Sequence, residues 1–524
     1  MARKLVANQD NTSTSSQTEP LTREVARPIF GENVLAIDYN FAEKDYLDDD
    51  IDFSRASGAT MTSQEGKVAF APHNEVPYTT DVGGTGWTNN LSIGITANQA
   101  DPFGGNEATR LQAPNDQQWS NTRLNLPVNL VANQPYVYSF YIKQDQTAAT
   151  TTQVRLGIQQ GSTWIVSQYA TMTNGSFEFN TLQSRITDTK IETLDDGWFR
   201  VSYSYTTNIA GTHKFAIYPD TQSVSGTGAV WVYGPQHEKT LTPENGPTSY
   251  YRNETSGSKQ APRFDYDKDG NSKGLLIEEA RTNLQPNSNS YTGTSQDKLN
   301  IETPVNNFAI SPSGARDAVR YECTSTGSAA RHEIYTRAAE TSGTTYTESV
   351  YVKPFGSVTR IIGSEGGGTS TAACFDLTTG QIVSVSGLSA TNSSITDCGN
   401  GWYRVSVTYV SPDTSADNYF YWALGDEAST ASSSAVFSNF NPSKGNGVYF
   451  WGNQREAGSF PTSLIPTYGA SASRAADIAS VSGTAFSRFY KQGTGGAWLV
   501  DSTELAEDRT AQTSPFAVYE SSSS

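Results

Sequence analysis

The stretch Asp196-Gly-Trp-Phe-Arg-Val-Ser-Tyr203 has a second version further along the chain, Asn400-Gly-Trp-Tyr-Arg-Val-Ser-Val407. Apolar and polar side chains alternate in both, so that Phe199, Val201 and Tyr203 fall on one face of an extended strand. A period of two is typical of antiparallel strands with one face in a core and the other exposed. The stretch therefore predicts β structure, and its second version predicts an internal repeat.

Three further blocks recur in the same order around this stretch. They are Glu107-Ala-Thr-Arg-Leu111 with Asp317-Ala-Val-Arg-Tyr321, Tyr138-Ser-Phe-Tyr-Ile-Lys143 with Glu348-Ser-Val-Tyr-Val-Lys353, and Val230-Trp-Val-Tyr-Gly-Pro-Gln-His-Glu238 with Val448-Tyr-Phe-Trp-Gly-Asn-Gln-Arg-Glu456. The spacing between blocks differs between the copies, as expected for loops of different length on one scaffold. We predict two copies of one fold, with four pairs of residues in equivalent positions. The pairs are Arg110 and Arg320, Lys143 and Lys353, Trp198 and Trp402, and Gly234 and Gly452.

The length of 524 residues exceeds what one hydrophobic core normally organises. The repeat and the many short alternating segments predict an all-β chain with two tandem jelly-roll-like antiparallel β-sandwiches, a flexible N-terminal arm and a short C-terminal β segment. The expected division is an arm or anchor at 1–33, a β segment leading into the first module at 34–73, the first sandwich at 74–255, a connecting β-hairpin segment at 256–285, the second sandwich at 286–470 and the C-terminal β segment at 471–524.

The composition excludes several classes of partner. No segment approaches the roughly 20 apolar residues of a membrane span, so membrane insertion is not expected. The net charge is -17, and without a Lys/Arg cluster the chain would repel nucleic acid. The basic residues near Met1 are not followed by an apolar stretch of the kind found in secretory signal peptides. We therefore expect synthesis in a cytoplasm.

Catalytic signatures are missing from the sequence. The four histidines form no HxH or HExxH pair, and no nucleophile elbow, P-loop or dinucleotide fingerprint occurs. Glycosidases need two carboxylates facing one sugar bond. Glu278 and Glu279 are adjacent and would point to opposite faces of a strand. We predict that the protein is not an enzyme and needs no cofactor.

One acidic segment is compatible with calcium. Asp265, Asp267 and Asp269 stand at positions 1, 3 and 5 of a possible loop, and Gly270 stands at position 6. Position 12, which supplies a bidentate glutamate in an EF-hand, is Leu276. The alternative is a polar hairpin turn, which an Asp-Gly pair favours.

Tryptophans outside the repeat are the candidates for sugar binding, because a pyranose stacks its C–H face on an aromatic ring while polar side chains bind its hydroxyl groups. Trp87, Trp119 and Trp164 lie in loop-like surroundings without a matched residue in the other copy. Trp198 and Trp402 lie within alternating strands, and we expect them in a core.

Four further blocks stand out in the sequence, at residues 262–284, 401–407, 449–456 and 461–467, and the densest is Gly274-Leu-Leu-Ile-Glu-Glu-Ala-Arg-Thr-Asn283. Together they resemble a family of bacteriophage virion proteins that carry concanavalin-like (LamG-like) lectin sandwiches. The resemblance covers roughly Ile51 to Asp477. In that family the stretch that resembles Phe53-Ser-Arg-Ala-Ser57 runs directly into the Pro-Arg-Phe-Asp block. Here the whole first sandwich stands between them and looks like a duplicated, inserted module.

The resemblance implies a non-enzymatic structural protein of the tail-fibre or head-fibre type, located in the virion. It also implies other virion proteins as partners, anchoring through the N-terminal arm, assembly as a homotrimer and host attachment through surface polysaccharide. Two alternatives stay open. One is a purely structural decoration or adaptor protein without glycan binding, and the other is a glycan depolymerase.

Overall fold

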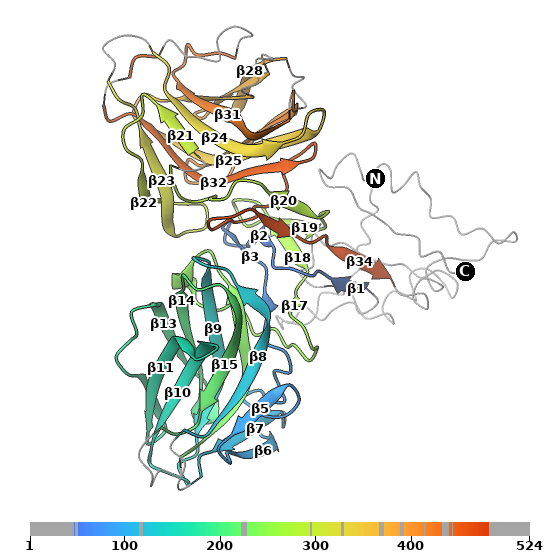
Figure 1. Ribbon diagram of the computed structural model, residues 1–524, viewed down its shortest axis with the longest axis vertical. Helices are drawn as coiled ribbons and strands as arrows, with labels where there is room; N and C mark the ends of the chain where they lie inside the picture. Colours follow the sequence, from blue (N-terminus) through green and yellow to red (C-terminus); the bar gives the residue numbers. More distant parts are fainter. Residues whose placement is uncertain are drawn as a thin grey trace, which may run out of the picture.

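The computed structural model describes residues 47, 51–114, 119–221, 228–293, 296–325, 330–365, 371–387, 392–412, 414–431, 440–442 and 444–481. The expected N-terminal arm at 1–33 lies outside these residues, as does most of the expected C-terminal segment. The described part of the chain forms two β-sandwiches with a junction of short strands between them (Figure 1).

The first sandwich consists of two antiparallel sheets of six strands each. Sheet 1A contains β5 (Trp87–Asn90), β8 (Asn121–Leu130), β10 (Thr151–Gln160), β11 (Thr163–Thr173), β12 (Ser176–Phe179) and β15 (Gly211–Tyr218), in the order β12-β11-β10-β15-β8-β5. Sheet 1B contains β6 (Gly94–Gln99), β7 (Ala108–Gln112), β9 (Pro135–Gln144), β13 (Ile186–Thr193), β14 (Trp198–Thr206) and β16 (Ala229–Lys239), in the order β13-β14-β9-β16-β7-β6.

The second sandwich repeats this topology. Sheet 2A contains β21 (Gln296–Leu299), β24 (Glu333–Glu340), β26 (Arg360–Glu365), β27 (Ala372–Asp376), β28 (Gln381–Ser386) and β31 (Ser415–Gly425), in the order β28-β27-β26-β31-β24-β21. Sheet 2B contains β22 (Val305–Ile310), β23 (Arg316–Glu322), β25 (Thr345–Phe355), β29 (Ser393–Asp397), β30 (Tyr403–Val410) and β32 (Gly447–Ala457), in the order β29-β30-β25-β32-β23-β22. The predicted fold class, all-β with two tandem antiparallel sandwiches, is confirmed.

Strand register confirms that the repeated blocks occupy equivalent positions. On β16 and on β32, one aromatic residue pairs with both the matched arginine and the matched lysine of its module. The two rows are Arg110–Trp231–Lys143 and Arg320–Tyr449–Lys353. Gly234 and Gly452 both adopt positive φ, at 57° and 65°, beside a shift in register. Trp198 and Trp402 are both buried, as predicted.

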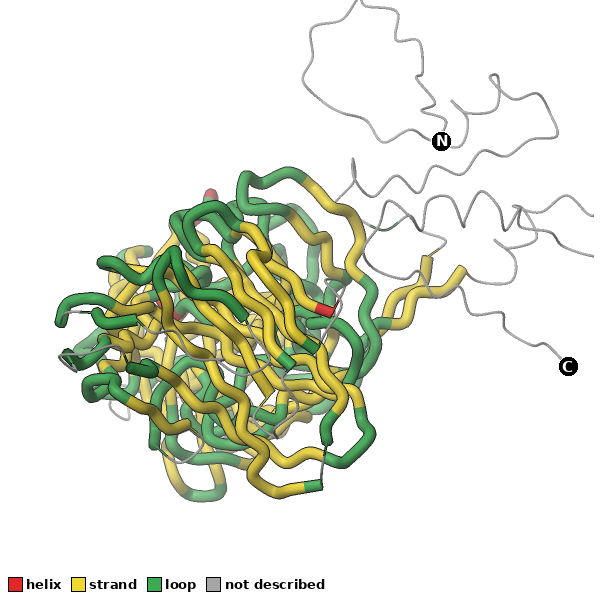
Figure 2. The backbone as a smooth tube through the Cα atoms, turned by 90° about the horizontal axis from the view of Figure 1, so that it is seen from above, coloured by secondary structure: helices red, strands yellow, loops and turns green. Residues whose placement is uncertain are grey.

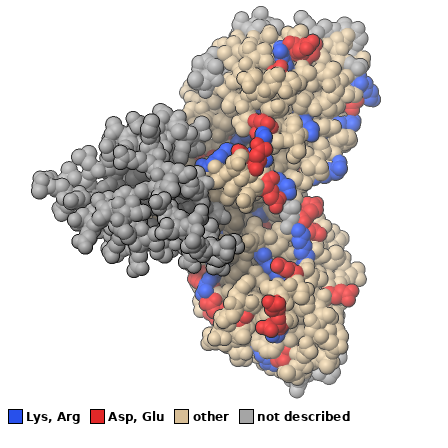
Figure 3. Space-filling view, turned by 180° about the vertical axis from the view of Figure 1, so that it is seen from behind, with Lys and Arg blue, Asp and Glu red and all other residues tan. Residues whose placement is uncertain are grey.

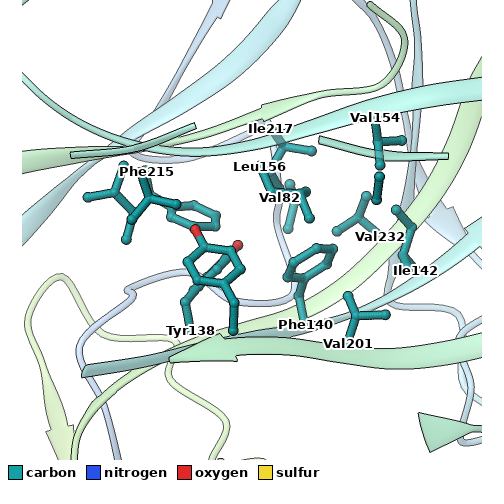
Figure 4. Close-up of a cluster of buried hydrophobic side chains, with 14 of the residues drawn as sticks. Val82, Tyr138, Phe140, Ile142, Val154, Leu156, Val201, Phe215, Ile217 and Val232 are labelled. Carbon is teal, nitrogen blue, oxygen red and sulfur yellow. The ribbon is translucent and has the colours of Figure 1, made fainter. Parts of the chain in front are cut away.

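The core of the first sandwich lies between its two sheets (Figure 4). Tyr138 and Phe140 of β9 face Val154 and Leu156 of β10, and the alternation of each strand sends every second side chain inward. Helical structure in the described residues is limited to short 3-10 turns, which include η1 (Asp195–Gly197) and η2 (Pro243–Asn245) (Figure 2). No helix in the described ranges has the length and apolar character needed to span a bilayer.

Five two-stranded pairs make up the junction. They are β1 (Ile51–Ser54) with β34 (Ile478–Val481), β2 (Thr60–Thr62) with β3 (Val68–Phe70), β4 (His73–Asn74) with β17 (Lys259–Gln260), β18 (Arg263–Tyr266) with β19 (Ser272–Leu276), and β20 (Arg281–Asn283) with β33 (Ala472–Arg474).

The β4–β17 pair places the entry of the chain into the first sandwich beside its exit. Beyond that pair, the Arg263 guanidinium donates to the Thr60 carbonyl at 2.9 Å, and the Thr62 backbone N–H donates to the Asp265 carboxylate at 2.8 Å. Segments on either side of the first sandwich in the sequence therefore lie together in space. This is the arrangement that an inserted module requires.

A buried cluster of ion pairs connects the parts of the junction. We call it the junction cluster, and its members are Arg55, Arg263, Glu278, Arg474 and Asp477. Arg55 lies 2.7 Å from the Asp477 carboxylate, which also pairs with Arg263. Glu278 accepts a hydrogen bond from Arg263 at 2.7 Å and forms an ion pair with Arg474 at 2.9 Å. Charged side chains also gather over the surface of the junction on the face opposite that of Figure 1 (Figure 3).

Candidate functional site

The outer face of sheet 1A carries the most unusual group of side chains in the described structure. Val154 and Leu156 of β10 point into the core. Because neighbouring residues on a strand face opposite ways, Arg155 and Gly157 lie on the outer face. Arg155 is nevertheless only 9% exposed, since aromatic rings surround it.

Four rings surround the Arg155 guanidinium, and we call this group the Arg155 face. Its carbon Cζ lies 3.7 Å from the ring centre of Trp164, 5.1 Å from that of Tyr218, 5.4 Å from that of Tyr169 and 5.7 Å from that of Trp119. A guanidinium over an aromatic ring is attracted by the negative charge density of the ring face. The contacts therefore fix the arginine and the rings relative to one another.

Register explains how these residues meet. Arg155 pairs directly with Tyr169 of β11 on one side and with Tyr218 of β15 on the other. Trp164 reaches the same place because β10 and β11 shift register after Ile158. Its ring lies across the backbone of Gly157, where an added Cβ would come within 2.3 Å of the indole. A glycine is thus needed at this position for the tryptophan to lie on the sheet.

A hollow of about 460 Å³ adjoins Trp164. Its lining residues are Trp164, Ile165, Gln183, Ser184 and Arg185. The Gln183 side-chain oxygen accepts the Ser167 backbone N–H at 2.8 Å, and Arg185 donates to the Ile165 carbonyl at 3.3 Å. An aromatic ring therefore stands beside polar groups that are held in place by the backbone.

The same sheet of the second module carries a different group. Tyr335 lies with its ring centre 4.8 Å from that of Tyr421, and Arg337 lies 4.9 Å from the ring centre of Tyr419. Arg337 also pairs with Asp297 at 2.8 Å. Aromatic residues thus occupy the outer face of this sheet in both modules, but only the first module has tryptophans there among the described residues.

Two of the three tryptophans predicted for sugar binding meet in this site. Trp119 is 42% exposed and Trp164 is partly exposed, and both contact Arg155. The expectation for Trp87 was wrong. It begins β5 opposite Leu124 and points into the core, where it is 8% exposed and packs 6.3 Å from the ring of Phe215.

The segment considered for calcium forms the turn of the β18–β19 hairpin. Asp267 accepts the backbone N–H groups of Asp269 and Asn271, each at 2.9 Å. Asp265 pairs with Lys273, and Asp269 pairs with Lys268. Within the described ranges no three His, Cys, Asp or Glu side chains converge as metal ligands. Asp265, Asp267 and Asp269 are thus engaged by the hairpin itself, which is the polar Asp-Gly turn weighed against the calcium loop.

Other titratable groups also have structural partners. Glu278 belongs to the junction cluster, and Glu279 pairs with Arg281. His237, which had no sequence signature, lies 2.7 Å from the Glu75 carboxylate and 2.8 Å from the Tyr205 hydroxyl. All three of these last residues are buried inside the first sandwich, out of reach of a polymeric substrate.

Sequence reasoning missed Arg155, Tyr169, Tyr218 and Gly157. The available signal was the run Thr151-Thr-Gln-Val-Arg-Leu-Gly-Ile158, in which the apolar positions define an inner face and leave one arginine and one glycine on the outer face. A glycine on the outer face of a strand leaves room for a large group to lie close to the backbone, and a neighbouring arginine attracts an aromatic ring. The pair together therefore favours an aromatic side chain packed on this face.

No protein-family model matches the chain. No curated protein matches it either. Similar solved structures include the tandem CBM22-1–CBM22-2 domain of Paenibacillus barcinonensis Xyn10C, with 12% identity, a TM-score of 0.24, and coverage of 74% of this chain and 98% of that one. The CBM22-1 xylan-binding domain of the same protein has 14% identity and a TM-score of 0.22, and the match covers 32% of this chain and 96% of that one.

A third similar structure is the M60 catalytic domain of Clostridium perfringens ZmpB with its CBM51-1 and CBM51-2 domains. It has 9% identity and a TM-score of 0.17, with coverage of 81% of this chain and 43% of that one. All three TM-scores are far below 0.5. These likenesses therefore carry no argument, and the sandwich fold of this chain is described from its own strand order.

Proposed function

We propose that the chain is a non-catalytic glycan-binding protein and that the Arg155 face is its binding surface. The observation that carries this proposal is the convergence of Trp119, Trp164, Tyr169 and Tyr218 on the open outer face of sheet 1A. Exposed rings on an open sheet face suit an extended sugar chain, because the rings of Trp119 and Trp164 can stack against the C–H face of a pyranose, while the buried Tyr218 supports Arg155 from below. Polar groups such as Gln183 then stand within reach of the hydroxyl groups.

We further propose that the protein is a structural component of a bacteriophage particle and attaches it to polysaccharide on the host surface. The support is the resemblance to lectin-type virion proteins, which is densest in Gly274-Leu-Leu-Ile-Glu-Glu-Ala-Arg-Thr-Asn283. In this proposal the partners are other virion proteins, the protein is located in the virion, and it assembles as a homotrimer. Residues 1–33 would provide the anchor.

A glycan array probed with the full chain tests the binding proposal. Trp164→Ala is expected to weaken binding of the best glycan about tenfold, equivalent to about 1.4 kcal/mol, because the stacking surface is lost. The free energy of unfolding should fall by less than about 1 kcal/mol, since Trp164 lies outside the core. Affinity is measured by calorimetry and stability by urea denaturation.

The matched control is Trp231→Ala. Trp231 is also partly exposed, but it lies on sheet 1B beside Lys143 and away from the Arg155 face. This change should leave glycan affinity unaltered. If the wild-type chain binds no glycan, the adaptor alternative replaces the proposal. If the chain releases reducing ends from a bound polysaccharide, the depolymerase alternative replaces it.

A further inference from the structure

Four basic side chains of the first module lack an acidic partner among the described residues. Arg123, Arg155 and Lys214 lie on the outer face of sheet 1A, because their strand neighbours Leu124 and Phe215 and the apolar residues of β10 point inward. Arg185 lines the hollow beside Trp164. In the part of the chain that the structure describes, none of these four has a carboxylate within 4.0 Å (their neighbours are Asn, Ser, Tyr and backbone groups).

This lack of partners is unexpected for the composition. The chain has 53 acidic residues and only 36 basic ones, so carboxylates are abundant. The equivalent sheet of the second module has two outward arginines, and each has an acidic partner: Arg337 lies 2.8 Å from Asp297, and Arg360 lies 3.5 Å from Asp376. The two modules share one topology and differ in whether the charge on this face is neutralised.

The geometry of Arg155 suits a planar anion. Its Nε donates to the Ser167 hydroxyl at 2.7 Å, while its two terminal amino groups donate to no protein atom among the described residues. The surrounding rings hold the guanidinium in one orientation and exclude water from its flanks. Two parallel N–H groups of a guanidinium match the two oxygens of a carboxylate.

Two arginines lie near the main stacking ring. Arg155 lies against Trp164, and Arg185 lines the adjoining hollow. A sugar stacked on the free part of Trp164 would therefore lie near two guanidinium groups. From these features we propose that the Arg155 face selects glycans that carry carboxylate groups, as polymers of hexuronic acid do. This inference rests on the proposed function, and it adds the chemical class of the ligand.

The test uses polysaccharide pairs that differ only in charge. Polygalacturonate, a glucuronate-containing capsule and a sialic-acid polymer are each compared with their carboxyl-reduced forms, in which every carboxylate has become a neutral alcohol. The full chain is expected to bind at least one acidic member at least tenfold more tightly than its reduced form. Dextran sulfate serves as a polyanion without carboxylates.

Variants locate the effect. Arg155→Gln and Arg185→Gln should each reduce the ratio of the affinities for the acidic and the reduced form at least fivefold. Arg360→Gln is the matched control, because Arg360 lies on the equivalent sheet and already has Asp376 as a partner. It should leave the preference unchanged. Arg185 lies outside the core, so its variant keeps the test valid if Arg155→Gln does not fold.

Each other outcome overturns the inference in a distinguishable way. Equal affinity for acidic and reduced forms would refute selection of carboxylates and leave glycan binding intact. If dextran sulfate binds tightly and Arg155→Gln does not weaken that binding, the protein attracts polyanions in general, and selection of carboxylates by the Arg155 face is refuted. No binding of any acidic or neutral glycan would refute the proposed function as well.

Discussion

Replacing Asp477 by alanine is expected to lower the free energy of unfolding by about 3–5 kcal/mol. Asp477 is buried and pairs with Arg55 and Arg263, whose side chains are also buried. Its removal leaves the Arg55 guanidinium without a carboxylate partner in the described structure and away from bulk water. An unpaired buried charge costs far more than an exposed ion pair contributes.

Urea denaturation followed by circular dichroism measures this effect. The control is Asp269→Ala, which removes the exposed partner of Lys268 and should change stability by less than about 1 kcal/mol. Equal midpoints for the two variants would contradict the assignment of the junction cluster as a stabilising element.

The same cluster predicts acid sensitivity. Burial alone would raise the pKa of Glu278, but the charges of Arg263 and Arg474 outweigh it and lower the pKa to about 2. A carboxyl whose pKa is lower in the folded state contributes stability above its unfolded pKa, near 4.5, and loses it as the pH falls towards 2. Stability should therefore fall between about pH 4.5 and pH 2, and Glu278→Gln should flatten that part of the profile.

Replacing Trp87 by alanine is expected to cost about 3–5 kcal/mol, because it leaves a cavity beside Phe215 in the core of the first sandwich. Trp119→Ala removes the same atoms from the surface and should cost less than about 1 kcal/mol. Glycan affinity should show the reverse order. When the two variants are compared at equal concentration of folded protein, only Trp119→Ala should weaken binding. Thermal unfolding and calorimetric titration of both variants provide the comparison, and equal loss of stability would contradict the placement of Trp87.

The repeat made most of the fold predictable. Blocks such as Gly197-Trp-Phe-Arg-Val201 carry their own period of two, and a second copy fixes which positions are equivalent. The local alternation of apolar and polar residues was therefore enough to predict the strands around Trp198 and Trp402. One signal was missed: Asn74-Glu-Val-Pro77 and Asn283-Leu-Gln-Pro286 share the pattern Asn-x-x-Pro.

These two asparagines make the same contacts in both modules. The Asn74 side-chain oxygen accepts the backbone N–H groups of Val76 and His237. The oxygen of Asn283 accepts those of Gln285 and Arg455. Each asparagine thus attaches the start of its module to the last long strand, and the Asn-x-x-Pro pattern marks the two starts.

The binding face was less predictable because it depends on contacts between distant segments. Trp87 and Trp119 have similarly polar neighbours in the sequence, and only the pairing of β5 with β8 decides that Trp87 points inward. Arg155 is one charged residue in an alternating strand, and its rings come from β11, β15 and the segment before β8. Register between strands, which sequence alone specifies weakly, brings them together.

Hydrogen–deuterium exchange of the full chain, with and without the glycan that it binds best, tests most directly whether the Arg155 face is the binding surface. We expect slower exchange in peptides that cover β10 and β11, residues 151–173, and in those that contain Tyr218. Peptides from sheet 2A should exchange at the same rate in both conditions. Protection confined to other segments, with residues 151–173 unchanged at saturating glycan, would contradict the proposal.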